Sequence, residues 1–129
     1  MPLQNYKELA LWQKSFHLSE IIDKVRTGFP NGYNSDLILN IKRLAKDVPG
    51  CIAAAGVHDS LKEGLSCLYS AYSSNCEFVA EMLRAKEKGE LDEIISEYFL
   101  SEINEVNRLL EATILDLEKQ TANEPGSKI

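Results

Sequence analysis

Between Ser60 and Leu83, apolar residues recur at steps of three and four, and this spacing restricts the fold more than any other feature of the sequence. On an ideal helix, which turns about 100° per residue, these side chains fall within about 80° of one another. They are Leu61, Leu65, Leu68, Tyr72, Cys76, Val79 and Leu83. A helix of that length measures about 36 Å and cannot bury such a stripe by itself. The pattern therefore predicts a long helix packed against partner helices of similar length.

Two more helices are predicted ahead of this stripe. The first is expected over residues 5–26, and a turn rich in proline, glycine and asparagine separates it from the second. The second helix is expected to begin after a cap at Asn34 or Ser35 and to end at Gly56. Pro49 lies within its apolar pattern and removes one backbone hydrogen bond, so we expect a kink there. The expected buried face of this helix consists of Leu37, Ile41, Leu44, Ala45, Val48 and Ile52.

The third and fourth helices complete the predicted fold. Ser60 followed by Glu63 is a capping-box pattern for the third helix, which is expected to end before Gly89. A fourth helix is expected from Glu90 to about residue 119. Its apolar stripe consists of Leu91, Ile95, Phe99, Ile103, Val106, Leu110, Ile114 and Leu117. The fold class is therefore expected to be all-α: an antiparallel up-down four-helix bundle over residues 1–120 with a kinked second helix, followed by a flexible tail over 121–129.

The first helix carries two apolar stripes. One can face the bundle core and consists of Leu11, Leu18, Ile22 and Val25. The other points about 120–160° away and consists of Leu9, Trp12 and Phe16. A wide core that wraps around the helix would cover the second stripe, and so would another subunit, because contiguous exposed apolar patches mark association sites. We interpret the second stripe as the interface of a homo-oligomer.

Charge is unevenly distributed along the 129 residues, whose formal net charge is −6. Through residue 76 there are eight basic and seven acidic residues, whereas from Glu77 onward there are six basic and thirteen acidic ones. This balance argues against a large phosphate-binding footprint. No apolar run is long enough to span a membrane and no signal-peptide pattern occurs, so the expected location is the cytoplasm, without a membrane partner.

The residue types that carry chemistry do not form a recognisable catalytic or metal-binding pattern. The three cysteines, Cys51, Cys67 and Cys76, lack a Cys-x-x-Cys pair and are expected to be buried as small apolar side chains. His17 and Glu20 give a single surface pair with no second cluster to complete a metal site. Gly-rich phosphate loops and nucleophile elbows are also missing. We therefore expect no enzymatic activity, no cofactor and no metal.

One basic strip is a candidate binding site. Lys42, Arg43 and Lys46 cluster on the second helix, about 100° or more from the centre of its apolar stripe, and Lys14 or Lys7 could join them from the first helix. The strip is explained either as a solvated helix face or as a contact for phosphate groups or an acidic partner.

Two segments resemble a known protein family. Residues 6–15, with the sequence YKELALWQKS, resemble the opening of the bacterial four-helix-bundle family called 23S rRNA-intervening sequence proteins, which typically begins Tyr-Lys/Arg-Asp/Glu-Leu-x-x-Trp-Gln-Lys/Arg-Ala/Ser. Residues 41–49, IKRLAKDVP, are similar to the family's stretch Gln-Ile-Arg-Arg-Ala-Ala-x-Ser-Ile-Pro-Ser-Asn-Ile-Ala-Glu-Gly. Further matching positions bring the resemblance to nearly all of residues 6–117: Ser60, Glu63, Ser74 and Glu77.

The chain departs from the family pattern after Pro49. Where the family has Asn-Ile-Ala-Glu-Gly, this sequence has Cys51, Ile52 and three alanines, and His58 stands where arginine is usual. The loss of polar residues at Cys51 and Ala54 argues against a shared binding role for this segment. Fold and assembly depend on the apolar stripes and are expected to be retained.

The resemblance implies an up-down four-helix bundle that assembles as a homopentameric ring. Distant relatives are accessory proteins of diversity-generating retroelements, in which a basic pentamer binds nucleic acid and a reverse transcriptase. Two functions therefore follow as hypotheses. The first is a non-enzymatic oligomeric adaptor or scaffold. The second is a nucleic-acid-binding accessory protein, with RNA, DNA or a retroelement reverse transcriptase as its partner.

Overall fold

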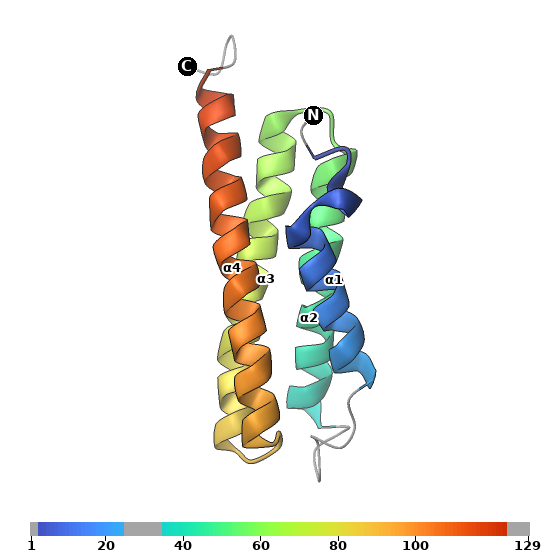
Figure 1. The fold of residues 1–129 in the computed structure, drawn as a ribbon, viewed down its shortest axis with the longest axis vertical. Helices are drawn as coiled ribbons and strands as arrows, with labels where there is room; N and C mark the ends of the chain where they lie inside the picture. The colour runs from blue at the N-terminus through green and yellow to red at the C-terminus, as the bar shows by residue number, and fades with distance from the viewer. Residues whose placement is uncertain (1–2, 25–34, 124–129) are drawn as a thin grey trace.

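The computed structural model describes residues 3–24 and 35–123, which form a short 3₁₀-helix and four α-helices. The elements are η1 (Tyr6–Glu8), α1 (Ala10–Lys24), α2 (Asp36–Val57), α3 (Leu61–Glu87) and α4 (Glu93–Ala122). Consecutive α-helices run in opposite directions along the long axis of the molecule (Figure 1). α1 and α3 each pack beside both α2 and α4, whereas among the described residues the backbones of α1 and α3, and those of α2 and α4, do not come close to each other. The predicted all-α four-helix fold is confirmed.

The first helix begins later than the sequence predicts. Residues 6–8 form η1, and Leu9 is extended (φ −75°, ψ 132°), so α1 starts at Ala10 and not at residue 5. The helix contains Leu11, Leu18 and Ile22, all of which are buried as expected. The predicted end of this helix, including Val25, lies outside the described residues.

α2 begins at the predicted cap but does not end at the predicted residue. The Ser35 hydroxyl accepts a hydrogen bond from the backbone N–H of Ile38 at 3.1 Å, which confirms Ser35 as one of the two expected caps. The helix contains Pro49 and continues through Gly56 to Val57. The prediction that Gly56 ends α2 is therefore wrong. The glycine at this position has a different structural role, which is described below.

The caps of α3 and α4 follow the predicted chemistry with shifts of a few residues. Ser60 accepts a hydrogen bond from the backbone N–H of Glu63 at 3.3 Å, while the Glu63 carboxylate lies 2.9 Å from Nδ1 of His58. Gly89 has a left-handed φ of 70° in the turn after α3, as a C-terminal glycine requires. Asp92, two residues after the predicted start, caps α4. The helix ends at Ala122, and residues 124–129 of the expected tail lie outside the described residues.

The buried face of α3 differs in register from the predicted stripe. Leu65 and Leu68 are buried as expected, but Tyr72 and Val79 are only half-buried. Cys76 and Leu83 are exposed, which contradicts their predicted places in the core. The residues that α3 buries are Gly64, Leu65, Leu68, Ala71, Asn75, Phe78, Met82 and Ala85. Apart from Leu65, their steps alternate between four and three, which is the spacing of about 3.5 residues typical of packed helix bundles.

The other helices bury the faces that their patterns predict. Ile41, Leu44, Ala45, Val48 and Ile52 of α2 are buried, with Leu37 half-buried. In α4 the whole predicted stripe is buried except for Ile95, which is half-buried. These side chains form two core clusters along the bundle, one around Phe78 and Phe99 and the other around Leu68 and Leu110.

The N-terminal segment packs against the last turn of α2, and Gly56 makes this approach possible. Leu3 is 2% exposed and belongs to a core cluster. A β-carbon on Gly56 would lie 2.5 Å from the backbone oxygen of Leu3 and 2.6 Å from Cδ1 of Tyr6. Both distances are shorter than real contacts allow. Glycine at position 56 therefore lets residues 3–6 lie directly on the helix.

Replacing Gly56 by alanine is expected to lower the free energy of unfolding by about 1–3 kcal/mol, because the new methyl group must displace a backbone oxygen and a ring. Gly50→Ala is the matched control, since a β-carbon there has no neighbour within 4 Å. In the monomeric chain it should raise the free energy of unfolding by about 0.5–1 kcal/mol through helix propensity. Urea unfolding at one low protein concentration measures the free energy of unfolding of both variants. Equal effects of the two substitutions would contradict the packing of residues 3–6 on α2.

The cysteines are less buried than expected. Cys51 and Cys67 are half-buried, and Cys76 is exposed because it lies outside the true core face of α3. Burial raises the pKa of the Cys51 thiol. In the part of the chain that the structure describes, no helix combines the length and apolarity needed to cross a membrane.

Candidate interaction site

Three aromatic side chains form a row along the N-terminal segment and α1. The rings of Tyr6 and Trp12 meet edge to face with centroids 5.4 Å apart, and those of Trp12 and Phe16 stack at 4.8 Å with 15° between their planes. Leu9 and Trp12 are half-buried and pack against a core cluster, whereas Phe16 is 41% exposed. The predicted second stripe is therefore only partly covered within one chain.

A shallow groove of about 280 Å³ runs between this row and α2. We call it the α1/α2 groove; its lining residues are Trp12, Phe16, Ser19, Lys46, Pro49, Gly50 and Ala53. Ser19 donates its hydroxyl proton to the backbone oxygen of Phe16 at 2.6 Å, so its polar group is satisfied within the helix. Because Gly50 and Ala53 have almost no side chain, the groove is open on the α2 side. It offers a mostly apolar surface with one lysine.

Arg43, the most prominent cation of the predicted basic strip, is occupied by its own helix. Its Nη1 donates to Oδ2 of Asp47 at 2.7 Å, and its Nε and Nη2 donate to Oδ1 of Asn40 at 3.0 and 2.7 Å. Asn40 in turn donates from Nδ2 to Glu81 on α3 at 2.9 Å. The guanidinium is thus part of a network that joins α2 to α3.

Two of the lysines considered for the strip, Lys46 and Lys14, also face acidic groups. Nζ of Lys46 lies 3.6 Å from a carboxylate oxygen of Asp23 on α1. Lys14 pairs at 3.0 Å with Glu102 on α4, so it does not join the strip on α2. Lys42 is half-buried and Lys7 is exposed on η1. The pairing reduces the net positive charge that this face can offer to a phosphate group.

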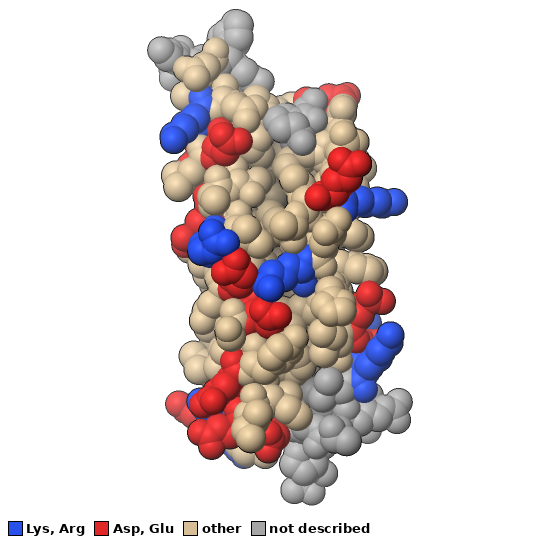
Figure 2. Space-filling view, viewed as in Figure 1, with Lys and Arg blue, Asp and Glu red and all other residues tan. Residues whose placement is uncertain are grey.

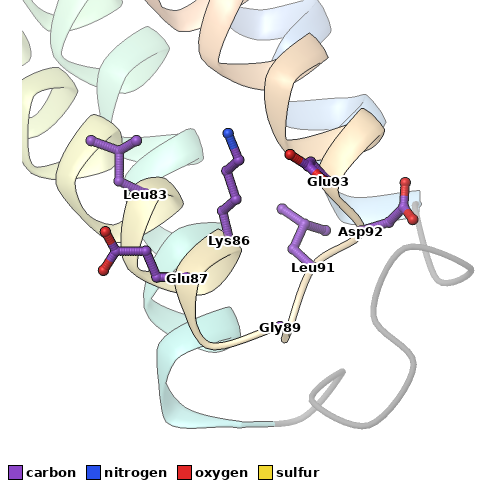
Figure 3. Close-up of a pocket in the computed structure, with 7 residues that line it drawn as sticks. All are labelled: Leu83, Lys86, Glu87, Gly89, Leu91, Asp92 and Glu93. Carbon is purple, nitrogen blue, oxygen red and sulfur yellow. The ribbon is translucent and has the colours of Figure 1, made fainter.

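A hollow of about 730 Å³ lies at the turn between α3 and α4. Figure 3 shows Lys86 standing between Leu83 and Leu91, while the carboxylates of Glu87 and Asp92 point away from each other. Acidic side chains gather at this end of the face seen in Figure 2, whereas charges of both signs alternate along the rest of it. Across residues 3–24 and 35–123, no three histidine, cysteine or acidic residues come together as a metal ligand set. The acidic side chains around this hollow therefore point apart and do not converge on one binding site.

A second apolar groove, about 340 Å³ in volume, lies between α3 and α4, and sequence reasoning missed it. We call it the α3/α4 groove; it is lined by Tyr69, Tyr72, Glu111, Ile114 and Leu115. Tyr69 is 47% exposed and Leu115 58% exposed. The sequence pattern places Tyr72 in the core because its register on α3 is shifted by about one position, and it gives Leu115 on α4 no role.

Both tyrosine hydroxyls of the α3/α4 groove are fixed by acids of α4. Tyr69 donates to Glu118 at 2.6 Å, and Tyr72 donates to Glu111 at 3.1 Å. These hydrogen bonds raise the pKa of both phenols. The polar ends of both rings are thereby tied to carboxylates of α4 at the edge of the groove.

The sequence model of one family, described as 23S rRNA-intervening sequence protein, matches residues 7–112. This span begins within η1 and ends within α4, so it includes Trp12 and Phe16 of the aromatic row and most of the residues that line the two grooves. No protein with a curated description matches the chain.

Proposed function

Because the chain belongs to the 23S rRNA-intervening sequence protein family, we propose that it is a non-enzymatic scaffold that works as a homo-oligomer. A ring of five copies, which the family resemblance implies, is the specific assembly we propose. The surface through which copies meet is the α1/α2 groove with its aromatic row.

The observation that carries this proposal is the exposed edge of the aromatic row. Phe16 remains 41% exposed although it stacks on Trp12, and the groove beside it is lined by small or apolar groups of α2. Aromatic side chains are enriched at the cores of protein interfaces, where a few residues carry most of the binding energy. A second copy would remove this surface from water, which favours association.

Trp12→Asp is expected to dissociate the assembly, because a carboxylate at the centre of an apolar contact cannot be solvated there. Loss of such an anchor typically weakens association by about 2–4 kcal/mol. Since Trp12 also packs within its own chain, Phe16→Glu is the second variant, at a more exposed position. Sedimentation velocity measures the mass, and circular dichroism checks that each variant stays helical.

The control is Ile94→Glu, which changes a side chain that is 78% exposed and lines neither groove. It should leave the mass of the assembly unchanged. A wild-type protein that sediments at 14.5 kDa at micromolar concentration would contradict the proposal.

The alternative is a nucleic-acid-binding accessory protein that uses Lys42, Arg43 and Lys46. The ion pairs of Arg43 with Asp47 and of Lys46 with Asp23 weigh against it. RNA or DNA binding that falls steeply with salt, and is lost when all three residues become glutamate, would favour this alternative over the scaffold.

A further inference from the structure

We propose that the α3/α4 groove docks a basic amphipathic helix of a partner protein. In this arrangement an apolar side chain of the partner packs on Leu115, and one cation of the partner lies beside each of Glu111 and Glu118. The inference goes beyond the proposed homo-oligomer, because it concerns a different surface from the α1/α2 groove and a different protein.

The centre of the α3/α4 groove is an apolar surface that the chain itself leaves open. Leu115 is 58% exposed and Tyr69 is 47% exposed, and both line the groove together with the buried Ile114. Leucine and tyrosine side chains that share one groove form contiguous apolar surface, which is typical of a protein-binding site. An apolar side chain placed over Leu115 would therefore remove surface from water on both partners.

Two acids of α4 stand on either side of Leu115 along the helix. Glu111, Leu115 and Glu118 occupy positions i, i+4 and i+7, which lie on one face of an α-helix. At about 1.5 Å per residue, the two glutamates are separated by a rise of about 10 Å. A partner helix has the same rise, so basic residues at its own positions i and i+7 match the two acids, with an apolar residue at i+3 or i+4 opposite Leu115.

The hydrogen bonds that fix these two acids come from neutral groups. The Tyr69 hydroxyl donates to Glu118 at 2.6 Å. Glu111 accepts from the Tyr72 hydroxyl at 3.1 Å and from Nδ2 of Asn107 at 3.3 Å. Such bonds position a carboxylate but leave its negative charge in place. Among the described residues that line the groove, none is a lysine or an arginine. The groove thus joins an apolar centre to two negative charges, which complement a basic segment and repel a phosphate backbone.

A helix is the form of partner that this groove fits. α3 and α4 run side by side in opposite directions (Figure 1), and the furrow between two packed helices can take the side chains of a third. Because Tyr69 and Tyr72 are already fixed by their hydrogen bonds, little side-chain freedom is lost when the partner binds. The α1/α2 groove offers no such match, since no carboxylate is among the described residues that line it.

The probe is a fluorescently labelled, alanine-based peptide of about 20 residues, which is long enough to form a helix in water. It carries arginine at positions i and i+7 and leucine at i+4. Fluorescence anisotropy should show saturable binding to the wild-type protein with a dissociation constant on the order of 100 μM. A peptide with glutamate in place of both arginines should bind at least about tenfold more weakly.

One variant of the protein removes the charge of the groove. Glu111→Gln combined with Glu118→Gln keeps an acceptor for each tyrosine hydroxyl and should weaken binding of the arginine peptide about tenfold. Its control is Glu77→Gln combined with Glu87→Gln, which changes the net charge equally at exposed positions of α3 outside the groove. The control should bind the peptide like the wild type.

A second variant removes the apolar centre. Leu115→Ala should weaken peptide binding about fivefold to tenfold, because the leucine of the peptide loses its contact. Ile94→Ala is the matched control, since Ile94 is also an exposed apolar residue of α4 but does not line the groove. Circular dichroism checks that every variant stays helical, and sedimentation velocity gives the mass of each.

The homo-oligomer and the partner helix can fail separately in these measurements. If Leu115→Ala lowers the mass of the assembly, a second copy occupies the groove, and the partner helix is overturned while the homo-oligomer stands. Peptide binding that is absent up to about 1 mM, or that the control variants weaken as much as the groove variants do, would also overturn the partner helix. So would a single-stranded RNA that displaces the peptide from the groove. A monomeric wild-type protein that binds the peptide would overturn the homo-oligomer alone.

Discussion

Replacing Phe78 by alanine is expected to lower the free energy of unfolding by about 3–5 kcal/mol, because it removes a large ring from the closed interior of the bundle. Phe78 is 2% exposed and lies in the core cluster that contains Met82 and Phe99. The surrounding helices relax only partially after such a truncation, so part of the cavity remains. Urea unfolding at a fixed protein concentration, followed by circular dichroism, measures the difference from the wild type.

Leu83→Ala is the matched control on the same helix. Leu83 is 45% exposed at the turn between α3 and α4, and its loss is expected to change the free energy of unfolding by less than about 0.5 kcal/mol. The apolar stripe predicted from the sequence places Leu83 in the core and does not include Phe78, so it predicts the larger loss of stability at Leu83. A loss at Leu83 as large as that at Phe78 would contradict the register of α3 described here.

This register marks the limit of what the sequence predicts about the fold. The stripe of α4 is correct because large apolar residues occupy every buried position of the helix except Ser96. α3 has apolar residues on two adjacent faces: Tyr72, Val79 and Leu83 on one, and Ala71, Phe78 and Met82 on the other. The predicted steps average about 3.7 residues and drift off the core, because helices that supercoil in a bundle repeat every 3.5 residues.

Small residues account for the other features of the fold that the sequence pattern does not predict. Ala71 and Ala85 are fully buried but look neutral in a search for large apolar side chains. Gly56 was interpreted as a helix end because glycine is common there, whereas its cause is the close approach of Leu3. That contact joins distant parts of the chain and leaves no local pattern.

The candidate site was predictable where it depends on one helix. Trp12 and Phe16 were expected on a stripe separate from the core face of the first helix, and the structure stacks them at 4.8 Å beside a groove. Their role as an oligomer interface remains a prediction. The pairing of Arg43 with Asp47 follows an (i, i+4) spacing visible in the sequence, but that of Lys46 with Asp23 needs the packing of α1 on α2. The α3/α4 groove depends on the register of α3, so it could not be found before that register was known.

Asn75→Asp is expected to lower the free energy of unfolding by about 3–5 kcal/mol at pH 7, because it places a carboxylate of nearly the same shape in the core. Asn75 is 1% exposed, and its Nδ2 donates to the backbone oxygen of Ile103 at 3.3 Å and to Oδ1 of Asn107 at 3.4 Å. A carboxylate would present a negative oxygen to these two acceptors in place of a donor. The protonated acid can still donate one hydrogen bond.

The effect of Asn75→Asp should therefore depend on pH. Burial and the two facing oxygens raise the pKa of the new carboxyl in the folded chain above its unfolded value of about 3.9. Between these two pKa values the folded chain holds a proton that the unfolded chain has lost, so the stability of the variant relative to wild type falls by about 1.4 kcal/mol per pH unit as the pH rises. Below about pH 4 most of the deficit should disappear.

Asn104→Asp provides the control, because Asn104 is exposed on the same helix as the two acceptors. It should change the free energy of unfolding by less than about 0.5 kcal/mol, with little dependence on pH. Urea unfolding of both variants and the wild type between pH 4 and pH 7 separates the two cases. If Asn75→Asp shows the same deficit at every pH, its carboxyl is not buried against Ile103 and Asn107, and the contact between α3 and α4 at this level differs from the one described.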